Sequence, residues 1–140
     1  MYDVAIIGGG PGGYAAALYA HNFGLSVALV EKRDVGGTCL HRGCIPAKSW
    51  IHTAEVFAEV AGAADVGVIA GLPTLDWTRA LQRKDAVVSQ LHKGLLGLLK
   101  QRKVEIVAGT GRLSGPGIVD VAGEAPQRLE ARKVIVATGS

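Results

Sequence analysis

The two cysteines of this chain, Cys39 and Cys44, stand between a glycine pair and a Pro-x-Lys sequence. In a regular α-helix their Cα atoms would lie about 8.6 Å apart. A disulfide needs a Cα separation of about 4.4 to 6.8 Å. The backbone between them must therefore leave helical geometry if the sulfurs are to pair, and Gly43, which has no Cβ, permits this at low cost. Pro46 suits the first turn of a following helix, where its missing N–H is not needed. The spacing indicates a strained redox pair at a helix entrance.

The elements that must position this pair begin with the first residues. Residues 2–7 are a short apolar, β-branched run, which predicts a buried parallel strand. Gly8, Gly10 and Gly13 follow in the spacing of the dinucleotide-binding fingerprint. In such a loop the first glycine turns the chain, the second lets a pyrophosphate approach the backbone, and the third lets helix and strand pack closely. A helix from Pro11 to about Phe23 would direct its N-terminal N–H groups at the phosphates.

Glu31 stands at the end of a second predicted strand, Ser26–Val30. A carboxylate about twenty residues after the glycines is placed to bind a ribose 2′-hydroxyl, and its charge would repel a 2′-phosphate. Strand, glycine loop, helix, strand and acidic residue in this order predict a dinucleotide site. The alternative is an ordinary glycine-rich turn.

The rest of the chain continues the pattern of an α/β protein. We expect a helix with a buried apolar face, a connector, a long helix capped by Asp76, a third parallel strand, a small antiparallel excursion and a further buried strand. In order, these are expected at residues 45–61, 62–73, 77–103, 104–108, 118–121 with 128–130, and 133–137. The predicted fold class is α/β, a Rossmann-like domain with a parallel sheet and flanking helices.

Composition excludes several functional classes. A chain of 140 residues suits one domain, and 49% apolar residues with twenty glycines fit an α/β protein with tight turns. No apolar run approaches the roughly 20 residues of a membrane helix, and no basic region precedes the first one, so we expect a cytoplasmic protein without a membrane partner. The net charge of +3 is scattered, so nucleic-acid binding is not expected. The histidines and cysteines lack the paired spacing of a zinc site, so we expect no metal.

Residues 36–48, with the pattern Gly-Gly-Thr-Cys-x-x-x-x-Cys-x-Pro-x-Lys, resemble the active-site signature of the flavin disulfide oxidoreductases. This family holds dihydrolipoyl dehydrogenase, glutathione reductase and mercuric reductase. Tyr14 and residues 45–48 are most similar to the dihydrolipoyl dehydrogenase branch. The resemblance covers essentially the whole chain, but only the first part of the family's architecture. It implies that residues 1–140 are an incomplete N-terminal FAD-binding domain, without the NAD domain and the C-terminal dimerisation domain.

The resemblance also implies site residues. FAD would be the cofactor, and NAD a co-substrate whose site is not on this chain. Cys39 would be the exposed sulfur that the substrate attacks, Cys44 the sulfur beside the flavin, and Lys48 a cation near the reactive flavin nitrogen. His41 and Arg42 lie between the cysteines, and the sequence leaves open whether they tune the thiols or are merely solvated. The other expected cofactor-binding residues are Gly8, Gly10, Gly13, Glu31, Lys32, Gly37, Thr38, Cys39, Gly111, Thr138, Gly139 and Ser140.

The implied function is oxidation of protein-bound dihydrolipoyl groups with NAD⁺, through a Cys39–Cys44 disulfide and FAD. The implied partners are a lipoyl-bearing acyltransferase of a 2-oxo acid dehydrogenase complex and, at full length, a second copy in a homodimer. Two alternatives remain open at this point. One is a sister enzyme of the glutathione- or mercuric-reductase type, and the other is an FAD-binding module with no turnover of its own.

Overall fold

A six-stranded sheet organises the protein, and the computed structural model describes all of residues 1–140. The strand order is β3-β2-β1-β6-β5-β4. The pairs β1–β2, β1–β6 and β2–β3 are parallel, whereas β4–β5 and β5–β6 are antiparallel. This mixed α/β architecture confirms the predicted fold class. The strands are β1 (Tyr2–Ile7), β2 (Val27–Glu31), β3 (Glu105–Ala108), β4 (Thr110–Gly115), β5 (Ile118–Ala122) and β6 (Gln127–Val136).

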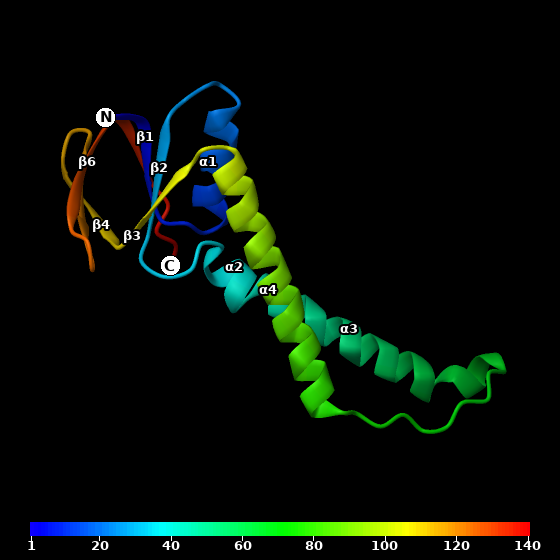
Figure 1. Ribbon diagram of the computed structural model, residues 1–140. Helices are drawn as coiled ribbons and strands as arrows, with labels where there is room; N and C mark the ends of the chain where they lie inside the picture. Colours follow the sequence, from blue (N-terminus) through cyan, green and yellow to red (C-terminus); the bar gives the residue numbers. More distant parts are fainter.

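Helices cover one face of the parallel strands. Helix α1 and the C-terminal end of α4 lie against this face (Figure 1), where the fully buried Leu99 of α4 packs with Ile6 and Leu29. No helix is both long and apolar enough to cross a bilayer. The helices are α1 (Pro11–His21), α2 (Gly37–His41), α3 (Cys44–Ala61), the 3-10 turn η1 (Ala63–Val66) and α4 (Trp77–Gln101).

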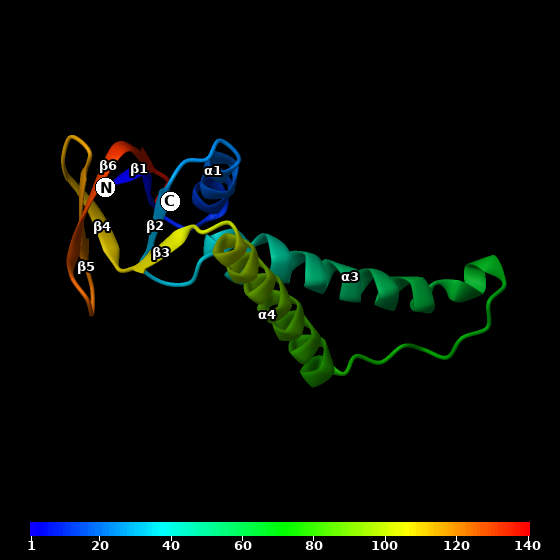
Figure 2. The same ribbon diagram turned by 45° about the horizontal axis from the view of Figure 1, so that its top comes forward.

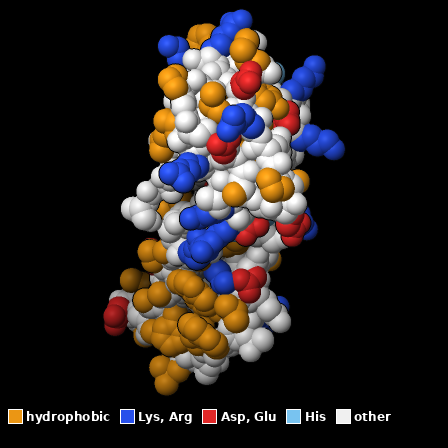
Figure 3. Space-filling view, turned by 90° about the vertical axis from the view of Figure 1, so that its left-hand side faces the viewer, with side chains coloured by type: hydrophobic (Ala, Val, Ile, Leu, Met, Phe, Trp, Pro, Cys, Tyr) orange, Lys and Arg blue, Asp and Glu red, His pale blue; other side chains and the backbone are white.

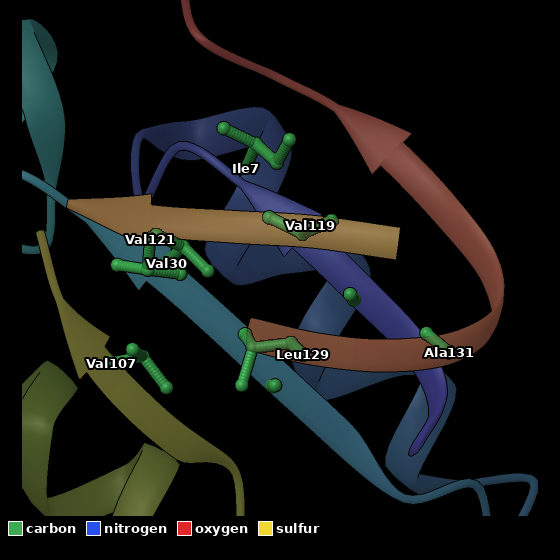
Figure 4. Packing of buried hydrophobic residues seen from close by; sticks show 9 residues of the cluster. Ile7, Val30, Val107, Val119, Val121, Leu129 and Ala131 are labelled. Carbon is green, nitrogen blue, oxygen red and sulfur yellow. The ribbon is translucent and has the colours of Figure 1, made fainter. Parts of the chain in front are cut away.

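The antiparallel strands fold back over the opposite face of the parallel strands. Val119 and Val121 of β5 and Leu129 of β6 pack toward Ile7 and Val30 (Figure 4). Side chains two residues apart on a strand point to the same face, so alternate positions of β5 and β6 supply this second core. β1 and β2 are thus buried on both faces, as their near-continuous apolar sequences predict. The expectation of a further buried strand at residues 133–137 is wrong, because Ile135 is 38% and Val136 62% exposed.

The antiparallel part is larger than the sequence analysis predicted. β6 is one continuous strand where two were expected: Gln127–Glu130 pairs with β5, and Ala131–Val136 then pairs with β1. A change of partner along one strand leaves the side-chain alternation unchanged, so the sequence carries no sign of it. β4 was not predicted, because Leu113 is its one strongly apolar residue and the pairing with β5 depends on the backbone.

The prediction that one face of α3 is buried is wrong for this chain. Its large apolar side chains Ile51, Val56, Phe57 and Val60 are 38 to 55% exposed. The reason is that α3 projects away from the sheet with only α4 beside it (Figures 1 and 2). Figure 3 shows hydrophobic side chains gathered at the lower end of the molecule, at the height of α3 and the N-terminal end of α4 in Figure 1. An amphipathic pattern indicates an apolar face, but it does not supply the neighbour that covers it.

Candidate active site

The glycine loop is held so tightly that side chains are excluded at two of its positions. Gly8 has φ +107°, and a Cβ there would lie 2.2 Å from the carbonyl oxygen of Ala137 at the end of β6. A Cβ on Gly13 would lie 1.7 Å from the carbonyl oxygen of Gly8. The loop therefore packs directly against the end of β6 and the start of α1, and only glycine fits at these two positions.

Helix α1 begins at this loop without any side chain over its N-terminus. Its N-cap is Gly10, which provides no side-chain cap, and its first turn contains no acidic residue. The N–H groups at the start of a helix have no acceptor within the helix. Together with the positive end of the helix dipole, they favour an anion such as a phosphate.

Glu31 is fixed in place at the end of β2. Its Oε2 accepts a hydrogen bond from the backbone N–H of Gly9 at 2.7 Å, and its Oε1 accepts one from the N–H of Arg33 at 2.9 Å. Each carboxylate oxygen can accept a second hydrogen bond, so the group keeps capacity for a ligand hydroxyl. Glu31 is thus oriented by the glycine loop itself.

Two cavities adjoin this carboxylate. The smaller, of about 70 Å³, lies toward the sheet, and a Cβ on Gly111 there would approach Ile7 to 3.0 Å. The larger, of about 600 Å³, extends to both cysteines. Gly8, Glu31 and Thr138 line both cavities, which together form a path from Gly111 to Cys44. The predicted residues along this path are Gly8, Gly10, Glu31, Lys32, Thr38, Cys39, Cys44, Gly111, Thr138, Gly139 and Ser140.

The remaining predicted site residues, Gly13, Gly37 and Lys48, do not line these cavities. Gly13 is packed against the glycine loop, as described above. Gly37 has φ +61°, and a Cβ there would lie 2.7 Å from the Cα of Gly10. Lys48 is exposed on α3, one helical turn beyond Cys44. The first two therefore shape the path, and the third lies beside its end.

The contact between the two glycine segments was missed by the sequence analysis. The N–H of Gly36 donates to the carbonyl oxygen of Gly9 at 2.8 Å, next to the close approach of Gly37 to Gly10. These contacts fix the start of α2, and with it the position of Cys39, against the start of α1. The one available signal was a second glycine pair shortly after the fingerprint, and nothing in it indicates that the two segments touch.

The helix breaks between the cysteines, as their spacing required. α2 ends at His41 and α3 begins at Cys44, and Gly43 between them has φ −126° and ψ −107°. A Cβ on Gly43 would lie 3.0 Å from the carbonyl oxygen of Thr38. The break lets α2 and α3 fold toward each other, so that the two cysteine side chains meet.

The two thiols are free in this structure, and they are in hydrogen-bond contact. This hydrogen bond is the main cause that raises the pKa of Cys39 above its ordinary value, and burial and the charge of Cys44 act in the same direction. The backbone of Cys44 and the positive charge of Lys48 lower the pKa of Cys39. The arrangement therefore disfavours loss of the proton from Cys39. Cys44 is the exposed thiol and Cys39 is partly buried, the reverse of the expected order of exposure.

His41 and Arg42 lie at the edge of the site. They line a polar cavity of about 140 Å³ that also includes Thr38. Nε2 of His41 is 3.0 Å from the carbonyl oxygen of Val35, and its ring meets the ring of His92 edge to face, with centroids 4.8 Å apart. Arg42 is exposed. His92 lies on α4, and no pattern in the sequence pointed to it.

Comparison with known proteins gives one consistent result. A family model described as pyridine nucleotide-disulphide oxidoreductase matches residues 2–140. The chain is similar to dihydrolipoyl dehydrogenases from Acholeplasma laidlawii, with 46% identity over 99% of the chain and 41% of the relative, and from Bacillus subtilis, with 43% identity over 99% and 31%. The one from Chlamydia muridarum is 42% identical over 99% of the chain and 30% of the relative.

A solved structure has the same fold. It is a Cu(II) complex of the HOCl-induced flavoprotein disulfide reductase RclA from Escherichia coli. The TM-score is 0.81 at 27% sequence identity, and the match covers 99% of this chain and 28% of that one. The chain therefore spans less than half the length of the proteins it matches.

Proposed function

The chain belongs to the pyridine nucleotide-disulphide oxidoreductase family, and we propose that it is the FAD- and dithiol-bearing part of a dihydrolipoyl dehydrogenase. The observation that carries this proposal is the identity of 40 to 46%, over 99% of the chain, to curated relatives of that name. The reaction proposed for the whole protein is oxidation of protein-bound dihydrolipoyl groups with NAD⁺. Residues 1–140 supply the FAD-binding domain, and the NAD site lies outside them.

The glycine loop and its surroundings support FAD as the cofactor. Side chains are excluded at Gly8 and Gly13, the N-terminus of α1 is uncapped, and Glu31 retains acceptor capacity for a ribose hydroxyl. The path past Thr138 suits an extended dinucleotide, with its adenosine end near Gly111 and its reactive end near the cysteines. Lys32, Gly37, Thr38, Gly139 and Ser140 complete the proposed binding set.

The cysteines carry the chemistry that this chain performs itself. With Cys39 and Cys44 joined as a disulfide, a dihydrolipoyl thiolate attacks the sulfur of Cys39, the S–S bond breaks, and Cys44 leaves as a thiolate. The second dihydrolipoyl sulfur then attacks the first, which closes the lipoyl disulfide and releases Cys39, which takes up a proton. Two electrons have passed to the cysteine pair, and one proton has gone to solvent. FAD, when bound, accepts these two electrons and passes them to NAD⁺ as a hydride.

The charges around the pair support this division of roles. The hydrogen bond with Cys44 raises the pKa of Cys39, which makes the Cys39 sulfur less favourable as a thiolate leaving group. Cys44 is the first residue of α3, a helix of 18 residues, and a helix N-terminus stabilises a thiolate. Lys48 adds a positive charge one turn along the same helix.

The proposed partners follow from the family. They are a lipoyl-bearing acyltransferase of a 2-oxo acid dehydrogenase complex, which would present the dihydrolipoyl group, and a second copy in a homodimer of the full-length protein. We place the reaction in the cytoplasm, where disulfides are usually transient and catalytic rather than structural.

The test is to purify the protein, add FAD and record its visible spectrum under anaerobic conditions. Dihydrolipoamide should remove the oxidised-flavin absorption of the complex, and Cys39→Ser and Cys44→Ser should each abolish that reduction while still binding FAD. Equal reduction by glutathione would favour the sister-enzyme assignment. If the protein does not bind FAD, the cofactor assignment fails.

A further inference from the structure

Helix α4 contacts both of the helices that carry the cysteines. Nη1 of Arg83 donates a hydrogen bond to Oγ of Ser49 on α3 at 3.1 Å. The ring of His92 packs edge to face on the ring of His41 on α2, with centroids 4.8 Å apart. Ser49 is five residues beyond Cys44, and His41 is two residues beyond Cys39. Each cysteine helix therefore has its own contact with α4.

Both contacts involve side chains, those of Ser49 and His41, that are at least partly buried and have further partners. Ser49 is the one polar residue of the buried set, at 7% exposure, and its carbonyl oxygen also accepts a hydrogen bond from the hydroxyl of Thr53. His41 is half-buried and held by Val35 as well as by His92. The two contacts therefore join ordered parts of α2 and α3.

α4 has a capped N-terminus and is anchored in the core at its C-terminal end. Asp76 caps its N-terminus by accepting a hydrogen bond from the N–H of Arg79 at 2.9 Å. At the other end Leu99 is fully buried in the core, and Arg102 donates to Asn22 at 2.7 Å. Arg83 and His92 are nine residues apart on this helix, which corresponds to about 13.5 Å along its axis. A continuous helix of this length keeps that separation constant.

The joint between the cysteine helices is the part that needs such support. Only Arg42 and Gly43 separate α2 from α3, and Gly43 is outside helical geometry. The distance between the sulfurs of Cys39 and Cys44 depends on the angle at this joint. Exchange between dithiol and disulfide requires a narrow range of separations, because disulfide geometry is specific.

We infer that α4 fixes the angle between the two cysteine helices. Arg83 and His92 are the positioning residues, which hold the sulfurs of Cys39 and Cys44 close to each other. The inference rests on the proposed dithiol chemistry. It assigns to α4 a role in setting how readily the pair closes to a disulfide, since proximity determines the effective concentration of one thiol for the other. Neither positioning residue touches the reacting sulfurs.

The experiment equilibrates the purified protein with mixtures of glutathione and its disulfide. Closing the pair transfers two electrons and two protons to glutathione disulfide, which yields two glutathione molecules, and the closed fraction gives the equilibrium constant. Arg83→Met and Ser49→Ala should each lower this constant by about threefold to tenfold, as for other contacting residues. The double variant should lower it no further than either single one, and Arg83→Lys should recover part of the loss.

His92→Ala should lower the constant by a similar factor, and this effect should add to that of Arg83→Met, because the two contacts are separate. The matched controls are Arg79→Met, on the same helix and without a side-chain partner, and His52→Ala, which is exposed on α3. Both should leave the constant unchanged. Thermal unfolding of each variant is measured as well. A contact that only stabilises the fold would change the unfolding temperature and leave the equilibrium constant for disulfide formation unchanged.

The outcomes distinguish this inference from the proposed function. If the wild-type cysteine pair forms the disulfide and the folded variants have the same equilibrium constant, the positioning role of α4 is wrong and the proposed function stands. If the wild-type cysteine pair forms no disulfide at any glutathione ratio, the proposed dithiol chemistry fails, and so does the positioning role of α4. Should Arg83→Met fail to fold, Ser49→Ala and Arg83→Lys decide the question.

Discussion

The backbone N–H of Gly9 donates a 2.7 Å hydrogen bond to Oε2 of Glu31, so the glycine loop and the carboxylate at the end of β2 hold each other in place. One acidic side chain therefore has two tasks. It orients the loop, and it offers its remaining lone pairs to a ligand hydroxyl. A change at this position should consequently affect cofactor binding more than a change at any other carboxylate of the chain.

Replacement of Glu31 by Gln should weaken FAD binding by about tenfold or more. The substitution keeps the size of the side chain but removes its charge, and a hydrogen bond to a charged group contributes about 1.5 to 3 kcal/mol. Quenching of flavin fluorescence on titration gives the dissociation constant. Glu59→Gln on exposed α3 is the matched control and should have no effect. Equal affinities of the two variants would remove Glu31 from the binding site.

Replacement of Gly37 by Ala should destabilise the protein by more than the left-handed backbone alone accounts for. Gly24 provides the comparison, because it also has positive φ, at +71°, but has no atom within 4 Å of the position of a Cβ. Gly24→Ala should therefore lose about 1 to 2 kcal/mol of unfolding free energy. Gly37→Ala adds a Cβ 2.7 Å from the Cα of Gly10, which forces the two segments apart. Its larger loss should be accompanied by weaker FAD binding, whereas Gly24→Ala should bind normally. Equal losses would show that the contact yields without cost.

The sequence predicted those parts of the site whose geometry is local. The glycine loop, Glu31 at the end of β2 and the helix break at Gly43 each depend on residues close together along the chain. By contrast, the approach of Gly37 to Gly10 and the contact of His92 with His41 join segments far apart in sequence, and no local pattern encodes them. The same reason explains the fold: the parallel strands were predicted, but the change of partner along β6 was not.

Removal of the Cys44 thiol should lower the pKa of Cys39. The hydrogen bond with Cys44 is the largest of the causes that raise it, so Cys44→Ala should move the thiol back toward its ordinary value. The rate of alkylation of Cys39 by iodoacetamide follows the thiolate fraction, and its rise with pH should occur at lower pH in the variant. Lys48→Met in the same background should shift the rise in the opposite direction, because the charge of Lys48 lowers the pKa. An unchanged profile in Cys44→Ala would mean that the two thiols do not interact in solution.

The hydroxyl of Tyr2 donates a hydrogen bond of 2.6 Å to Oε2 of Glu105, which raises the pKa of Tyr2 to about 12. Burial and the negative charge of Glu105 act in the same direction. Because the folded-state pKa lies above the ordinary value of 10.0, the stabilising contribution is complete below pH 10 and is lost as the pH rises through about 12.

Tyr2→Phe should therefore be less stable than wild type at neutral pH, and the difference should shrink as the pH rises from 10 to 12. Urea denaturation at a series of pH values measures this difference directly. Tyr19→Phe is the control, because Tyr19 is 66% exposed and its ring packs edge to face on Phe23 without a hydroxyl hydrogen bond. Its difference from wild type should stay constant over the same range. A Tyr2→Phe difference that does not change with pH would show that the hydrogen bond does not link β1 to β3 in solution.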